Sequence, residues 1–252
     1  MIEFDHMLDA LAHPLIQDLK IGAFTEHDVV NLILQRSEII RDQHRPGKVV
    51  GAWVDGDHAP ALALVDKMGE ELAKRAAAII LLEYLEIKDA IDAISPKSTA
   101  DIGCGYALFD LFLWNDHPGK LILIDIEQSE ERHFGYRETG AAYSNLKTAK
   151  KFLKDNGVKA SDIICINPEK DDLSKQKTVD MAVSFISCGF HYPVGTYMDY
   201  FRDGVADDGA VILDFRGRKA REGVGILKEL GTVSMLTDAA NGNAKRVMLK
   251  KG

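Results

Sequence analysis

The sequence has few cysteines, no long apolar run and no basic start, and each of these shortages excludes a class of protein. Its 252 residues include three cysteines, Cys104, Cys165 and Cys188, without paired spacing. This argues against a disulfide framework and for a reducing compartment. The longest uncharged apolar stretch, residues 76–82, is far shorter than the roughly 20 residues of a membrane span. Acidic side chains stand near the start, where a secretion signal carries basic ones. We therefore expect a cytoplasmic protein that has no membrane partner.

Basic residues are in the minority along the whole chain. Lysine and arginine total 31 against 39 aspartate and glutamate residues, and the formal net charge is -8. This balance repels a phosphate backbone, so no nucleic-acid partner is expected. The local exception is a basic cluster that consists of Arg216, Arg218, Lys219 and Arg221. The cluster either grips a phosphate or, more simply, forms the solvated entrance of a helix.

Residues 1–95 are predicted to be helical, without a strong strand. Thr25 with Asp28 three residues later forms a variant of the capping box and opens a helix over residues 29–40. Residues 41–60, rich in proline, glycine and aspartate, are expected as a hinge. A long amphipathic helix fills the remainder of this part. The extension is expected to serve as a lid over a pocket, or equally as the contact of a homodimer.

From Thr99 onward, short apolar runs alternate with helical segments, which is typical of a parallel sheet covered on both faces. The predicted strands are residues 99–102, 121–126, 163–166, 179–185, 210–215, 232–236 and 246–250. The predicted helices are residues 106–115, 139–156, 194–205 and 220–230. The last two strands are joined by a short polar loop and should form an antiparallel hairpin. The expected fold is α/β, with a Rossmann-like seven-stranded, mostly parallel sheet over residues 96–252.

The most informative motif joins the first two predicted strands. Asp101-Ile-Gly-Cys-Gly ends one strand in two closely spaced glycines, and Asp125 closes the next strand. Such glycines let backbone amides approach a ligand, and an acid at the neighbouring strand tip can accept two ribose hydroxyls. A dinucleotide fingerprint needs a further glycine three residues on, where this chain has Leu108. The motif therefore predicts a nucleoside site that holds no pyrophosphate.

The same acid and glycines resemble the first motif of class I S-adenosylmethionine-dependent methyltransferases, except that Ala107 replaces a further glycine. The resemblance covers roughly residues 97–250 and implies S-adenosylmethionine as the cofactor. It implies that Asp101 orients the loop and the methionine amino group, and that Asp125 binds the ribose. The cofactor-binding residues expected on this basis are Asp101, Gly103, Cys104, Gly105, Asp125, Ile126, Asn167 and Phe185. The plainer alternatives are a helix cap for Asp101 and a solvated turn for Asp125.

The segments after the third and fourth strands narrow the expected chemistry. Asn167 is expected to contact the adenine ring, although Asn-Pro is equally a turn signal. The fourth strand lacks the tetrapeptide of amino-group methyltransferases, an Asp or Asn followed by two prolines and an aromatic residue, so methylation of a nucleobase amine is disfavoured. Three short motifs resemble sequences assigned as sugar O-methyltransferases: Phe134-Gly-Tyr-Arg, Tyr143-Ser-Asn-Leu-Lys and Phe190-His-Tyr-Pro.

A hydroxyl acceptor must lose a proton as it is methylated. His191 is the expected general base, because imidazole titrates near neutral pH and this one should face the pocket after the fourth strand. The alternative is that it anchors its own loop, and His133 is the reserve base. The residues expected to contact the substrate are Tyr136, Arg137, Phe190 and Tyr192. Arg137 would bind a carboxylate or phosphate, unless it forms a surface salt bridge.

No metal is expected. Cys104, Cys188 and His191 lack a recognised ligand spacing, and no acidic pair that a magnesium site needs accompanies Asp180 and Asp214. The predicted function is O-methylation of a hydroxyl on a sugar or small polar metabolite, so the expected partner is a small-molecule acceptor. The alternatives are an N- or carboxyl-methyltransferase of a small molecule, a protein that binds S-adenosylmethionine without turnover, and a nicotinamide oxidoreductase.

Overall fold

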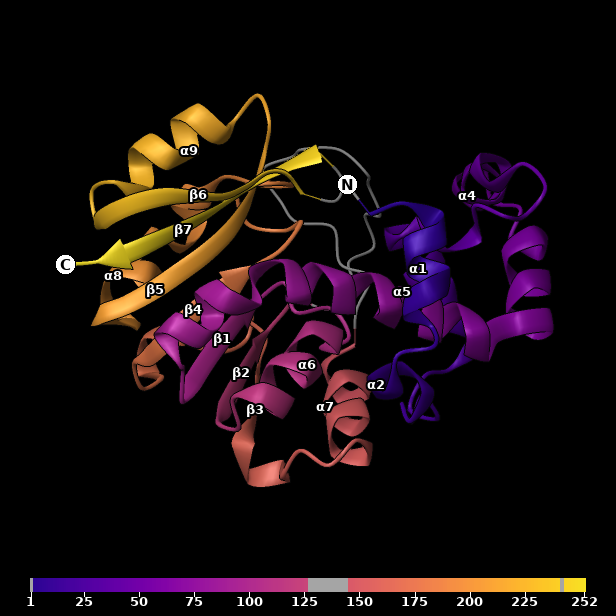
Figure 1. The fold of residues 1–252 in the computed structure, drawn as a ribbon, viewed down its shortest axis with the longest axis horizontal. Coiled ribbons are helices and arrows are strands. Elements are labelled where there is room, and N and C mark those ends of the chain that lie inside the picture. Colours follow the sequence, from indigo (N-terminus) through magenta and orange to yellow (C-terminus); the bar gives the residue numbers. More distant parts are fainter. Residues whose placement is uncertain (1, 127–144, 241–242) are drawn as a thin grey trace.

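A computed structural model describes residues 2–126, 145–240 and 243–252. One sheet has the strand order β3-β2-β1-β4-β5-β7-β6 (Figure 1). Its strands are β1 (Ser98–Ile102), β2 (Lys120–Ile124), β3 (Ile163–Ile166), β4 (Val179–Ser184), β5 (Val205–Arg216), β6 (Gly231–Ala240) and β7 (Ala244–Lys251). Strands β1 to β5 are parallel, and β7 runs antiparallel to both β5 and β6. The predicted fold class, a Rossmann-like, mostly parallel sheet with a C-terminal antiparallel hairpin, is confirmed.

Helices cover both faces of the sheet (Figure 1). On one face lie α6 (Leu108–Asp116), α7 (Leu146–Asp155) and the second half of α5 (Ala59–Ile94). The other face is covered by α8 (Met198–Asp203) and α9 (Ala220–Leu227). Because side chains alternate along a strand, Met181 and Val183 of β4 contact the first layer and Ala182 contacts the second. Strands that are buried on both faces in this way produce the continuous apolar runs of the sequence.

The N-terminal helices lie beside the sheet, around the first half of α5 (Figure 1). They are α1 (Phe4–Ala10), α2 (Pro14–Gln17), α3 (Glu26–Gln35) and α4 (Pro46–Val54). The predicted capping box at the start of α3 is confirmed: the Asp28 N–H donates to Thr25 Oγ1, and the Thr25 N–H donates to the Asp28 carboxylate. Helix α5 departs from helical geometry at Met68, directly before Gly69, which is a common cause of a kink. One long helix thus supports both parts of the molecule.

Two sequence-based expectations need correction. Residues 41–60, expected as a hinge, contain α4, because a proline at position 46 costs nothing in the first turn of a helix and Val49 and Trp53, one turn apart, are buried. The helix expected over residues 194–205 is a 3-10 turn, Val194–Tyr197, followed by the short α8. Its last residue belongs to the sheet, since Val205 pairs with β4 at the start of β5.

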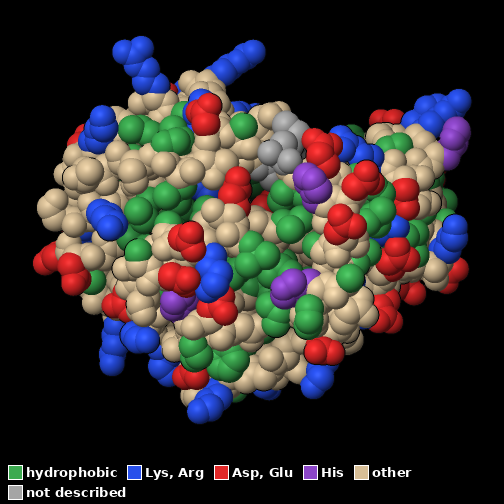
Figure 2. Space-filling model, in the orientation of Figure 1, with side chains coloured by type: hydrophobic (Ala, Val, Ile, Leu, Met, Phe, Trp, Pro, Cys, Tyr) green, Lys and Arg blue, Asp and Glu red, His purple; other side chains and the backbone are tan. Residues whose placement is uncertain are grey.

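A groove of about 510 Å³ lies between α1 and α5. It is lined by Leu81, Leu82 and Leu85 of α5 together with His6 and His13. Figure 2 shows hydrophobic side chains gathered near the middle of this face of the molecule, with histidines beside them. Among the described residues, no helix combines the length and the hydropathy that a membrane span requires.

Candidate functional site

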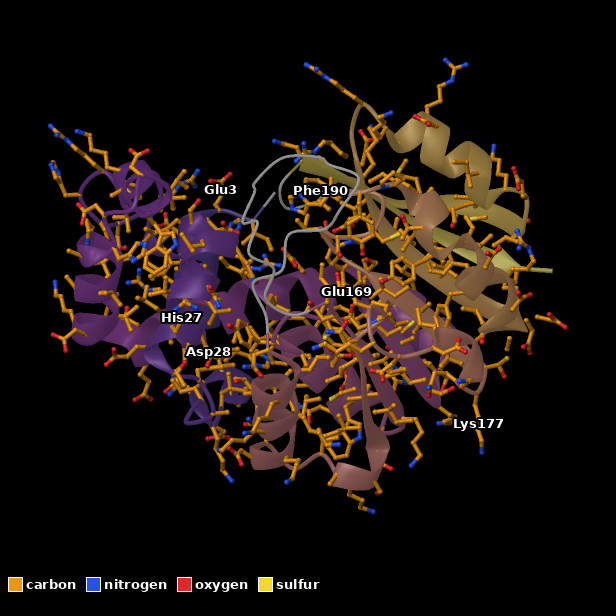
Figure 3. All side chains as sticks on the ribbon, turned by 180° about the vertical axis from the view of Figure 1, so that it is seen from behind. Glu3, His27, Asp28, Glu169, Lys177 and Phe190 are labelled. Carbon is orange, nitrogen blue, oxygen red and sulfur yellow. The ribbon has the colours of Figure 1, made fainter. Side chains whose placement is uncertain are left out.

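The carboxyl ends of the parallel strands meet along one edge of the sheet, where ligands bind in open α/β folds. Figure 3 shows Glu169, from the loop after β3, and Phe190, from the loop after β4, toward this edge. Lys177, which precedes β4, lies well away from Phe190 at the other end of the strand. Asp28 approaches from the helical part of the molecule. The candidate site is therefore bounded by strand ends on one side and by N-terminal helices on the other.

The loop after β1 takes its shape from two glycines. Gly103 and Gly105 have φ angles of 76° and 57°, in the left-handed region that favours glycine. The N–H of Gly103 donates to the Ile124 carbonyl at 2.7 Å, which ties this glycine loop to the tip of β2. A Cβ on Gly103 would lie 2.1 Å from Ser187 Oγ, whereas a Cβ on Gly105 would meet, among the described residues, only Gln35, 4.0 Å away. The described part of the chain thus leaves space beside the loop at Gly105.

Three buried carboxyl groups surround the glycine loop. The exposed fractions of Asp101, Asp110 and Asp125 are 4%, 0% and 9%. Asp110 of α6 lies beside Asp101 of β1, and both buried oxygens of Asp110 lack a hydrogen-bond partner among the described residues. Two buried carboxylates at close range repel each other, which favours the protonated form of one of them. Burial raises the pKa of Asp110 to about 7.

No cation of the described residues pairs with Asp101 or Asp110. Burial raises the pKa of Asp101 well above its usual value, and the neighbouring charges of Asp110 and Asp125 raise it further. The Cys104 thiol, in the same loop, has a raised pKa from burial and from the same acids. Carboxylates that are buried without a countercharge are unfavourable. The described residues around the loop therefore favour a ligand that carries positive charge.

Hydrogen bonds tie the glycine loop to its surroundings on both sides. Asp125 Oδ2 accepts the N–H of Gly105 at 3.0 Å. The Tyr106 hydroxyl donates to Asp28 Oδ1 at 2.8 Å and accepts from Asn31 Nδ2 at 2.9 Å, and all three side chains are buried. Helix α3 is thus joined to the loop, and the N-terminal helices help to shape the site.

The turn after β4 approaches the glycine loop in a strained conformation. Ile186 has a φ of 50°, which is rare for a β-branched residue and costly unless its surroundings enforce it. The N–H groups of Phe190 and His191 donate to the Ser187 carbonyl at 3.0 and 2.8 Å. Ser187 Oγ lies 3.1 Å from the Tyr192 hydroxyl. These bonds close a compact turn, residues 186–192, which places Ser187 against the glycine loop.

Two buried ion pairs lie near this turn. Arg246 of β7 donates through Nε and Nη2 to the two oxygens of Asp214 of β5, at 2.7 and 2.8 Å, and both side chains are fully buried. The pKa of Asp214 is raised by burial, and interactions with Arg246 and with the N–H of Ile186 offset part of that rise. Arg36, at the end of α3, forms a second bidentate pair with Glu83 of α5 at 2.8 and 3.0 Å. Asp214 therefore contributes to holding Ile186 in its left-handed conformation.

The structure brings most of the predicted cofactor-binding residues to neighbouring strand ends. Six of them surround or flank the glycine loop: Asp101, Gly103, Cys104, Gly105, Asp125 and Ile126. Asn167, which follows β3, caps its own turn by accepting the Glu169 N–H at 3.0 Å, as its Asn-Pro sequence also indicates. Phe185, directly after β4, is half-buried; its ring packs 4.5 Å from that of Phe109 and 4.5 Å below the Arg246 guanidinium.

The predicted substrate and catalytic residues divide into described and undescribed ones. The rings of Phe190 and His191 meet edge to face at 5.2 Å. Phe190 is 7% exposed, and the Arg216 guanidinium covers its ring at 4.8 Å. Tyr192 turns to the other face of the sheet, where its ring lies 6.2 Å from that of Tyr197. The remaining predicted residues, His133, Tyr136 and Arg137, lie outside the described residues.

Metal-binding groups do not converge in the part of the chain that the structure describes: no set of three or more His, Cys, Asp or Glu side chains is arranged to hold an ion. Burial raises the pKa of the Cys104 and Cys188 thiols, which makes both poor ligands at neutral pH. Asp180 accepts the Lys97 and Ser98 N–H groups at the amino end of the sheet, whereas Asp214 lies near the opposite end.

Several side chains of this site were not predicted. Asp110 carries a sequence signal, because it is the one acid within the apolar run of residues 108–113, where a buried charge needs a reason. No sequence signal marks Ser187 or the hydrogen bond from Tyr106 to Asp28, because each depends on which segments meet in the folded protein. Arg246 was placed in a strand, but its pairing with Asp214 follows only from the register of β5 and β7.

No family model and no curated protein matches this chain. Solved structures of related fold include a candidate O-methyltransferase from Nostoc punctiforme PCC 73102, 14% identical, with a TM-score of 0.49 over 89% of this chain and 72% of that one. Human N-acetylserotonin methyltransferase is 10% identical, with a TM-score of 0.48 over 75% of this chain and 58% of its own. Magnesium protoporphyrin IX methyltransferase from Synechocystis PCC 6803 is 13% identical, with a TM-score of 0.46 over 71% and 85%. Likenesses this low leave the chemistry to be argued from the site itself.

Proposed function

We propose that this chain is an S-adenosylmethionine-dependent methyltransferase that acts on a hydroxyl of a small polar molecule or sugar. The observation that carries the proposal is the pair of buried acids Asp101 and Asp110 beside the glycine loop, next to which the described residues place no cation. S-adenosylmethionine bears an ammonium and a sulfonium charge and no phosphate. A dinucleotide brings two phosphates, which the same carboxyl groups would repel. The structures of human N-acetylserotonin methyltransferase with this cofactor and of the Synechocystis enzyme with its demethylated product agree with the proposal.

The residues present fit this cofactor. Asp101 would hold the amino group, and the open space beside Gly105 would admit the methionine portion. Asp125, which already orients Gly105 through its N–H, would accept the ribose hydroxyls. Asn167, after β3, would face the adenine edge. When bound, S-adenosylmethionine supplies a methyl group on a positively charged sulfur.

The chain's own contribution to the reaction is to place the acceptor and to take its proton. His191 lies in the turn after β4. Its imidazole would accept the proton of the hydroxyl as the hydroxyl oxygen bonds to the methyl carbon and the methyl–sulfur bond breaks. Phe190 and Tyr192 belong to the same compact turn and would bound the acceptor's position. The N-terminal helices would form the opposite wall and exclude water.

Calorimetric titration tests cofactor binding first. We expect S-adenosylmethionine and S-adenosylhomocysteine to bind and NADH not to bind. Asp125→Asn should weaken S-adenosylmethionine about tenfold or more, because a charge-assisted hydrogen bond is lost. Asp208→Asn, an exposed aspartate near the start of β5, is the matched control and should bind normally. Tight NADH binding without affinity for S-adenosylmethionine would refute the proposal.

A methyl-transfer assay then separates an enzyme from a binding protein. Radiolabelled S-adenosylmethionine is offered with hydroxyl, amine and carboxyl acceptors, and the methylated product is identified. The proposal expects product from hydroxyl acceptors. Products on amines or carboxylates alone would favour the corresponding N- or carboxyl-methyltransferase, and binding without any product would favour a protein that senses the cofactor.

A further inference from the structure

The compact turn of residues 186–192 separates two regions of opposite charge. On one side lie Asp101 and Asp110 beside the glycine loop, next to which the described residues place no cation. On the other side lies Arg216, at the end of β5, whose backbone N–H meets the Gly189 carbonyl at 3.4 Å. The same turn therefore borders both regions, and Arg216 is close to the proposed site of methyl transfer.

The Arg216 guanidinium is held in place but not neutralised. It covers the ring of Phe190 at 4.8 Å, a cation–π contact that fixes a planar cation against an aromatic face. Its side chain is half-buried. Within the described residues, no ion pair or hydrogen bond occupies the guanidinium donors. An ordered arginine whose donors are unused is suited to bind a carboxylate or phosphate in bidentate fashion.

The nearby acids are already paired with other cations. Residues two apart on a strand face the same side of a sheet, so Arg216 and Asp214 share one face of β5. Asp214 is bound on both oxygens by Arg246, and Glu83 is bound on both oxygens by Arg36. Asp214, the acid on the same face of β5, is therefore already neutralised. Within the described residues, the charge of Arg216 is left for a ligand.

We propose that Arg216, supported by Phe190, binds an anionic group of the acceptor, so that the substrate is a hydroxylated carboxylate or phosphate ester rather than a neutral sugar. This inference rests on the proposed function. In this arrangement the acidic side chains bind the cationic cofactor, and Arg216 binds the anionic acceptor. Electrostatic complementarity of this kind selects partners and fixes their orientation.

The test compares Arg216→Gln with Arg218→Gln, which removes the same charge from an exposed position two residues along the chain. Protein loaded with S-adenosylhomocysteine is titrated with salicylate, as a hydroxylated carboxylate, and with glucose 6-phosphate, as a phosphate ester. The neutral counterparts are salicylamide and glucose. At least one anion should bind the wild type about ten to a hundred times more tightly than Arg216→Gln, as expected for a lost bidentate ion pair. Arg218→Gln should behave as the wild type, and which anion binds identifies the charged group.

Turnover provides a second measurement. For any hydroxylated anion that is methylated, Arg216→Gln should raise KM at least tenfold, with kcat and the affinity for S-adenosylmethionine little changed. Arg216→Lys should restore only part of the loss, because an ammonium lacks the planar pair of donors. The inference is overturned if neutral and anionic compounds bind alike, if no probe anion shows dependence on Arg216, or if the two arginine variants behave alike. Failure of S-adenosylmethionine to bind the wild type would instead refute the proposed function.

Discussion

The raised pKa of Asp110, which lies buried beside Asp101, makes stability depend on pH in a defined direction. Burial raises the pKa of Asp110 from 3.8 to about 7, so the folded protein retains a proton that the unfolded chain releases near pH 4. A folded-state pKa above the unfolded value gives stability that is present in full below the unfolded pKa. That stability is lost as pH rises toward the folded pKa. The loss should be complete slightly above pH 7.

Asp110→Asn removes this titration and supplies an amide N–H to Asp101. Each pH unit between the two pKa values corresponds to about 1.4 kcal/mol. The free energy of unfolding of the variant should therefore exceed that of the wild type by about 4 kcal/mol at pH 8 but by only about 2 kcal/mol at pH 5. Asp110 is fully buried, so solvent screening does not reduce this figure greatly, although titration of the neighbouring Asp101 spreads it over the pair.

Urea unfolding at pH 5, 6, 7 and 8 measures the difference in unfolding free energy between Asp110→Asn and the wild type. Asp208→Asn is the control, because an exposed aspartate should give a difference that is small and independent of pH. A gain for Asp110→Asn that stays constant across this range would contradict the raised pKa of Asp110. A loss of stability at pH 8 would contradict it more strongly, since the wild type should then be at its greatest disadvantage.

Three other substitutions probe the site and its supports. His191→Ala should lower kcat about a hundredfold or more while S-adenosylmethionine affinity, measured by calorimetry, is retained; loss of both together would make this histidine structural. Tyr106→Phe should cost about 1–3 kcal/mol in urea unfolding, because two buried partners each lose a hydrogen bond, and an unchanged midpoint would show that water replaces the hydroxyl. Arg246→Met should destabilise the protein by about 3–5 kcal/mol by leaving Asp214 buried and unpaired. The double variant with Asp214→Leu should recover much of that loss, and no recovery would mean that the two residues act independently.

The fold class and the positions of the strands along the chain were predictable because they follow from periodicity and loop length. Short apolar runs alternate with helices, and the polar connection before the last strand permits only a hairpin. The predicted strand of residues 163–166 matches β3. Helix α4 was missed because Pro46 and its neighbouring glycines are read as breakers, although a proline is favourable in the first turn. Sequence alone could not show that Val49 and Trp53 find a core to pack against.

The candidate site was predictable only where its residues follow one another closely. Asp101 and the two glycines are local, and Asp125 lies at the tip of the next strand, so the parallel register brings them together. The pairing of Asp214 with Arg246 depends on an antiparallel register that spans 32 residues of chain. The strained conformation of Ile186 likewise depends on contacts between loops, which no local pattern encodes.

The two glycines of the loop are required for different reasons, so only one of them is evidence for a ligand. Gly103 has no side chain because Ser187 occupies that space, and a Cβ there would lie 2.1 Å from its hydroxyl. Its presence is therefore explained by packing between the ends of β1 and β4, whether or not a ligand binds. Among the described residues a Cβ on Gly105 would meet only Gln35, and the Gly105 N–H is oriented by the carboxylate of Asp125. Gly105 thus lies beside the buried acids on the side of the loop that the described residues leave open, and this coincidence, more than the glycine spacing, supports the proposed cationic nucleoside.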